Sequence, residues 1–203
     1  MLICALLINV SIVFCESYAL WHIKNKLNIL KYYTYLQNFL ALITSMIFSI
    51  AVLTCIISDT TIPEYVEGLR YIATSGLVAT MFIFIVFLGA GKKSKITKDD
   101  IYPGCSPQVV NILLHYACPV LSWISFLLFE KDISLSNGIW TSIVSLPSCL
   151  YWTVYLILSL THRWQEPYNF QSNGKKTFLP ELVSFVLIPL SFIIISFLLW
   201  NIR

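Results

Sequence analysis

The chain has 203 residues, of which 58% are hydrophobic and only 11% are charged, and its formal net charge is +3. A soluble domain carries about 25% charged residues, so this chain has too few polar side chains to coat a soluble globule. The composition therefore excludes a soluble fold and predicts an integral membrane protein, with one transmembrane domain over residues 1–203.

Six apolar runs are each long enough to cross a bilayer as a helix of roughly 20 residues. The predicted transmembrane helices are Leu2–Trp21, Tyr33–Ile57, Tyr71–Ala90, Val109–Phe129, Ile139–Leu160 and Phe178–Trp200. Short connections join them, so neighbouring helices run antiparallel, and Pro147 is expected to kink the fifth. The predicted fold class is all-α, an integral membrane bundle of six transmembrane helices.

The basic residues lie mostly in the first, third and fifth connections. By the positive-inside rule these connections are cytoplasmic and both termini lie outside; the expected location is the plasma membrane. The outer connections hold only the basic residues Arg70 and Lys131, together with the acids Asp59, Glu64, Glu67, Glu130 and Asp132. The basic balance thus reflects contact with anionic lipid head groups, and we expect no nucleic-acid partner.

No motif indicates a cofactor or a metal. The chain has no Walker-type loop, no dinucleotide fingerprint and no H-E-x-x-H sequence. None of its six cysteines forms a C-x-x-C pair, and most lie inside apolar runs, where a cysteine is usually a small buried hydrophobe. We therefore predict no cofactor and no metal site.

Each predicted helix carries polar residues on one face, and several of them share a depth. Glu16 lies near the cytoplasmic end of the first helix, and at 1.5 Å rise per residue His115 lies equally deep, roughly 10 Å. The predicted polar layer consists of Glu16, Thr34, Asn38, Asn111, His115 and Glu181. Ionisable groups are costly in a bilayer, so this layer is the candidate functional site.

These residue types can support acyl transfer. Histidine can take the proton of a threonine hydroxyl, which then attacks an ester carbonyl. Glu16 or Glu181 could orient the imidazole, and Asn38 or Asn111 could stabilise an oxyanion. Thr34 and His115 are level only if the second helix begins before Tyr33. The alternative is a structural histidine in a non-catalytic protein that binds lipid or a membrane partner. A transporter is a third reading, but no half of the chain looks duplicated.

Three stretches resemble one family of six-helix membrane proteins, the FAR-17a/androgen-induced-type proteins and their bacterial "Pr-six-Pr" relatives. The stretch 31–38 (KYYTYLQN) is similar to the start of their second helix, and 114–121 (LHYACPVL) resembles the bacterial His-Tyr-x-x-Pro-x-Leu segment. The stretch 161–170 (THRWQEPYNF) resembles the loop after the fifth helix, although it lacks the glycine and the second proline of that loop.

The resemblance implies a function. The animal members are intramembrane threonine hydrolases of fatty acid esters of hydroxy fatty acids. Their nucleophile and base match Thr34 and His115, which makes a membrane lipid ester the expected substrate. The position of Pro119 matches the bacterial segment and is one residue earlier than in the animal proteins. The bacterial relatives have no established activity. The resemblance thus supports the six-helix fold more strongly than the hydrolase.

Overall fold

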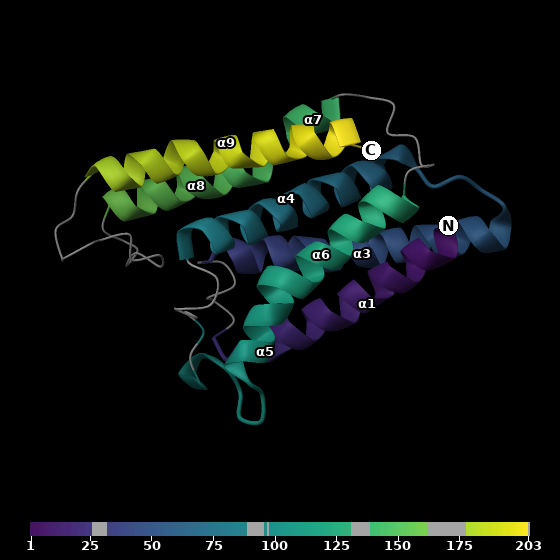
Figure 1. Ribbon diagram of the computed structural model, residues 1–203, viewed down its shortest axis with the longest axis horizontal. Helices are drawn as coiled ribbons and strands as arrows, with labels where there is room; N and C mark the ends of the chain where they lie inside the picture. The colour runs from purple at the N-terminus through teal and green to yellow at the C-terminus, as the bar shows by residue number, and fades with distance from the viewer. Residues whose placement is uncertain (26–31, 89–95, 97, 131–138, 162–177, 203) are drawn as a thin grey trace.

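The computed structural model describes residues 1–25, 32–88, 96, 98–130, 139–161 and 178–202, without the side chains of residues 159–160, 178–185 and 187–188 (Figure 1). Its α-helices are α1 (Leu2–Trp21), α3 (Tyr33–Ser58), α4 (Glu64–Leu88), α5 (Pro107–Ile112), α6 (Cys118–Ile124), α7 (Ile139–Ile143), α8 (Leu146–Leu160) and α9 (Phe178–Ile202). The fold is an all-α bundle, as the apolar runs predict.

Five helical segments of the described chain are long and apolar enough to cross a membrane. They are Leu2–Trp21, Tyr33–Ser58, Glu64–Val86, Pro107–Phe129 and Ile139–Leu158. The last helix, α9, is 25 residues long, and its part Pro189–Ile202 is apolar. The chain is therefore a multi-pass integral membrane protein.

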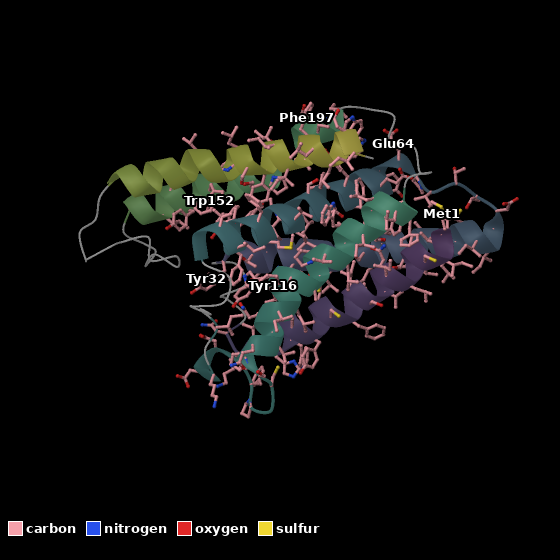
Figure 2. The ribbon with its side chains drawn as sticks, viewed as in Figure 1. Met1, Tyr32, Glu64, Tyr116, Trp152 and Phe197 are labelled. Atoms are coloured by element: carbon pink, nitrogen blue, oxygen red, sulfur yellow. The ribbon has the colours of Figure 1, made fainter. Side chains whose placement is uncertain are left out.

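The bundle has two ends, which we name the Tyr33 end and the Ser58 end after the bounds of α3. Figure 2 places Tyr32 and Tyr116 toward the first and Met1 and Glu64 toward the second. At the Tyr33 end, the residues after α1 pair with those before α5: Lys24 N donates to Asp100 O (2.9 Å), and Tyr102 N donates to His22 O (2.9 Å). Burial and the nearby Asp100 carboxylate raise the pKa of Tyr32, so its phenol stays neutral.

The central helix is α4, which lies between α8 and α9 on one side and α3 and α6 on the other (Figure 1). In the apolar stretch of α4 that could cross the membrane, 61% is buried inside the bundle, against 28% in the same stretch of α1 and of α3. Small residues allow this close packing. Gly76 shows why: a Cβ at this position would collide with the side-chain amide of Gln37 on α3.

The fourth transmembrane segment is not a uniform α-helix. It alternates α5 and α6 with two π-helical turns, Leu113–Ala117 and Ser125–Phe129. A π-turn adds a residue to the helix and so changes where the following side chains point, and such turns are frequent at functional sites. The first of them contains His115.

The structure corrects two placements. The third transmembrane helix begins at Glu64 instead of Tyr71, so Glu67 and Arg70 belong to the helix, where both are buried. The start before Tyr33 that would make Thr34 and His115 level is not seen at Tyr32, because the backbone of Tyr32 is extended (φ −107°, ψ 120°). The fifth segment breaks between α7 and α8, with Pro147 in the first turn of α8, as the kink prediction requires.

Candidate functional site

The predicted polar layer draws its side chains from α1, α3 and the fourth segment. Glu16 and Asn38 are completely buried, Asn111 and His115 are each 7% exposed, and Thr34 is half-buried. We call these five residues the Glu16 layer. Glu181 belongs to α9, but its side chain lies outside the described residues.

His115 has one fixed ring nitrogen. Its Nδ1 lies 3.1 Å from the backbone carbonyl oxygen of Asn111, which can only accept, so Nδ1 carries the proton. The ring packs on Phe84 of α4, with ring centroids 4.0 Å apart. In the neutral imidazole the lone pair is therefore on Nε2, for which no partner is recorded among the described residues. A backbone carbonyl holds Nδ1 where a carboxylate was expected.

Glu16 is an acid without a hydrogen-bonding partner. Neither carboxyl oxygen has a well-aligned partner in the described part of the chain. The groups that interact with the carboxyl are the thiols of Cys118 and Cys15, which also interact with each other. Glu16 thus lies against α6 at the level of Cys118, and no positive charge in the described part of the chain compensates a negative charge there.

The face of α3 behind Thr34 is also under-bonded. Asn38 Nδ2 donates to the Thr34 carbonyl oxygen (2.7 Å), but no described group binds Asn38 Oδ1. Gln37 Nε2 donates to the Tyr33 hydroxyl, and Gln37 Oε1 is likewise without a partner. Residues four apart share a helix face, so Thr34 lies on the same face of α3 as Asn38, one turn nearer the start of the helix.

Sequence neighbours of Thr34 and His115 pack in one hydrophobic cluster, but no described contact joins the two residues themselves. Tyr35, which follows Thr34, packs in one hydrophobic cluster with Val110 and Leu114, and Leu114 precedes His115. The described contacts include no direct hydrogen bond between the Thr34 hydroxyl and the imidazole. A nucleophile–base contact at this site would therefore require a bridging water or a change on substrate binding.

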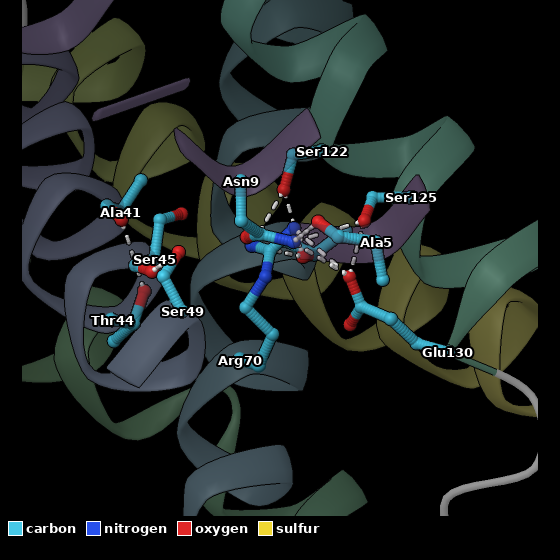
Figure 3. Close-up of polar contacts among 11 residues, drawn as sticks. Ala5, Asn9, Ala41, Thr44, Ser45, Ser49, Arg70, Ser122, Ser125 and Glu130 are labelled. Atoms are coloured by element: carbon cyan, nitrogen blue, oxygen red, sulfur yellow. Dashed lines mark hydrogen bonds and ion pairs between the residues drawn. The ribbon is translucent and has the colours of Figure 1, made fainter. Parts of the chain in front are cut away.

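A second polar cluster, which the sequence did not reveal, lies toward the Ser58 end (Figure 3). We call it the Arg70 cluster; its members are Asn9, Arg70, Thr74, Ser122, Ser125 and Glu130, all of them buried. Arg70 donates to Thr74 Oγ1 (3.0 Å) and Ser122 Oγ (2.9 Å) and pairs with Glu130 Oε1 (3.5 Å).

The acid of this cluster is shared between helices. Asn9 Nδ2 on α1 donates to Glu130 Oε1 (3.2 Å) and lies 3.0 Å from Ser125 Oγ, and Ser125 also donates to Glu130. The Arg70 guanidinium carbon lies 6.0 Å from the centre of the Phe48 ring on α3. The cluster thus ties α1, α3, α4 and the fourth segment together.

Little in the sequence could have revealed this cluster. Arg70 and Glu130 adjoin apolar runs, and a count of charges assigns such residues to connections. The one local signal is Thr74, four residues after Arg70 and on the same helix face. The pairing with Glu130, 60 residues further on, has no local signature.

Comparison of the chain with family models, with curated proteins and with solved structures found no match. The site is therefore interpreted from its own geometry.

Proposed function

We propose that this multi-pass membrane protein hydrolyses a lipid ester inside the bilayer, with Thr34 as nucleophile and His115 as base. The observation that carries the proposal is the imidazole of His115. Its Nδ1 is fixed on the Asn111 carbonyl, and no described group bonds its Nε2 in a buried polar layer. A base needs this arrangement, because the fixed proton orients the ring and leaves a lone pair for the substrate side.

In the proposed reaction, Nε2 takes the proton of the Thr34 hydroxyl while the oxygen attacks the ester carbonyl. The alcohol leaves with that proton, and water then releases the fatty acid from the acyl-threonine by the same route. The Asn111 side-chain amide, which makes no hydrogen bond within the described structure, would donate to the oxyanion. Asn38 serves less well, because the Thr34 carbonyl already occupies its amide group.

Two further points support the proposal. Residues 31–38 and 114–121 resemble segments of the six-helix family, and Thr34 and His115 match the nucleophile and the base of its animal members. The predicted orientation, with the Tyr33 end at the cytoplasmic face of the plasma membrane, would open the layer to lipids of the inner leaflet. In the proposed reaction the chain acts as one transmembrane domain and uses no cofactor.

An activity-based fluorophosphonate probe on the purified protein tests this function. We expect labelling of the wild type, retention of labelling in Thr34→Ser, and its loss in Thr34→Ala and His115→Gln, by roughly 10²-fold or more. Thr80→Ala is the matched control, because Thr80 is a buried threonine on α4 whose hydroxyl donates to its own helix at Gly76 O and Leu77 O.

Labelling that persists in Thr34→Ala would place the nucleophile elsewhere. The absence of labelling in every form, with lipid still co-purifying, would favour the alternative of a non-catalytic protein that binds lipid or a membrane partner. In that case His115 has the structural role that its contacts with Phe84 and Asn111 also permit.

A further inference from the structure

Glu16 differs from the buried acid Glu130 in its surroundings. It lies in α1, five residues before the helix ends at Trp21, and its side chain is completely buried. A helix rises 1.5 Å per residue, so the carboxyl lies about 7 Å below the Tyr33 end. Neither oxygen accepts a well-aligned hydrogen bond from a described residue.

Among the described residues, the groups that interact with Glu16 offer no positive charge. From α1 itself and from α6, the thiols of Cys15 and Cys118 interact with the carboxyl. On α3, which packs along α1, the buried polar residues nearest the Tyr33 end are the uncharged Gln37 and Asn38. In the π-turn, His115 packs on Phe84 of α4 and bonds its own helix. In the other π-turn, the hydroxyl of Ser125 is bonded to Glu130.

A carboxylate in such a place is unstable. Moving an isolated charge from water into a low-dielectric interior costs more solvation free energy than contacts with thiols can recover. In practice such a group takes up a proton. Glu130 shows the opposite solution, because Arg70, Asn9 and Ser125 surround its carboxylate. The two acids therefore differ in whether a described neighbour compensates a negative charge.

We propose that Glu16 is a reversible proton-binding site, protonated in the resting protein and able to exchange its proton with the Tyr33 end. Ionisable residues inside membrane helices commonly serve as proton relays, and the ligand of this site is the proton itself. No oxidant, metal or second substrate is required. The inference stands apart from the hydrolase, and its test measures no ester cleavage.

Infrared spectroscopy of the folded protein in nanodiscs separates this site from a fixed structural acid. We expect a carboxylic-acid C=O band at neutral pH that shifts in D₂O and is absent in Glu16→Gln. The band should fade as pH rises and return when pH is lowered, because deprotonation converts the acid to a carboxylate. In Glu16→Asp a shifted acid band should remain, and Glu130→Gln should leave the Glu16 band in place.

A hydrophobic carbodiimide gives a second measurement. The carboxylic O–H adds across one C=N bond, and the product rearranges to a stable N-acylurea with no leaving group, so the adduct is visible by mass spectrometry. We expect the adduct on Glu16 and its absence in Glu16→Gln, with labelling that declines as pH rises. An acid band that is missing at neutral pH would show an ionised Glu16. A band that persists at every pH at which the protein stays folded would show a proton that never leaves. Either result overturns the proposal.

Discussion

The Arg70 cluster and the Glu16 layer share the same two helical segments but differ in how their buried acids are bonded. Asn9 and Glu16 lie seven residues apart, two turns along α1, and both face the fourth segment. In the first region the guanidinium and the carboxylate bond to each other and to four neighbours. In the second, both Glu16 carboxyl oxygens and the side-chain oxygen of Asn38 have no hydrogen-bonding partner among the described residues.

The difference indicates which region holds the bundle together and which is available for chemistry. Hydrogen bonds and an ion pair between helices rigidify a core, even though Arg70 Nε and Asn9 Oδ1 have no described partner. An unpaired buried acid instead leaves a cost that a ligand, a proton or water can relieve. The Arg70 cluster is thus structural, and the Glu16 layer is the candidate functional region. The following substitutions test this contrast.

The largest effect is expected from breaking the buried ion pair. Arg70→Met leaves the Glu130 carboxylate buried without its cation, and we expect a loss of about 3–5 kcal/mol in the free energy of unfolding. Unfolding in mixed micelles, followed by circular dichroism, measures this loss. The double variant Arg70→Met/Glu130→Gln should recover much of it, because no charge then remains unpaired. A single variant as stable as the wild type would show that the cluster is not structural.

A smaller effect is expected at the contact between α3 and α4. Gly76→Ala places a methyl group against the Gln37 amide, and we expect a destabilisation of about 1–3 kcal/mol from overpacking. The same unfolding assay checks it. Gln37→Ala should rescue Gly76→Ala, since the shorter side chain makes room for the methyl group. Equal losses in the single and double variants would argue that α4 tolerates no side chain at residue 76 for another reason.

The smallest change in stability is expected at Glu16. Glu16→Gln removes no described hydrogen bond and no charge pair, so at neutral pH the free energy of unfolding should change by less than about 1 kcal/mol. Glu130→Gln is the matched acid and should cost more, because it removes the partner of Arg70. Equal losses at the two positions would remove the contrast between the regions.

The helices were largely predictable because long apolar runs have little freedom in a bilayer. The first runs over Leu2–Trp21 both in prediction and in structure, and the second differs by one residue at its end. The third differs at its start, because Glu64, Glu67 and Arg70 lower the apolar signal of the turns that contain them. Hydropathy cannot distinguish a charge in solvent from one that is paired within a bundle.

The candidate site was predictable only as a set of residue types at a common depth. Helical spacing groups Asn111 with His115, but it does not show that the Asn111 carbonyl would hold the imidazole, because an intrahelical carbonyl is available to any residue four positions on. The π-turn around His115 has no sequence signature that we can identify. The roles of Thr34 and His115 remain a prediction that the proposed labelling experiment decides.

The bonds of Asn9 have a consequence for biogenesis. Its partners Ser125 and Glu130 are synthesised 116 and 121 residues later. At about 5–20 residues per second, the nascent first helix waits roughly 6–24 s for them. During this time Asn9, which can bond Ala5 O within its own helix, and Glu16 both lack their neighbours from the fourth segment. The first helix should therefore stay beside the insertion machinery until the fourth segment emerges, and a chain truncated before Pro107 should be a preferred substrate for membrane quality control.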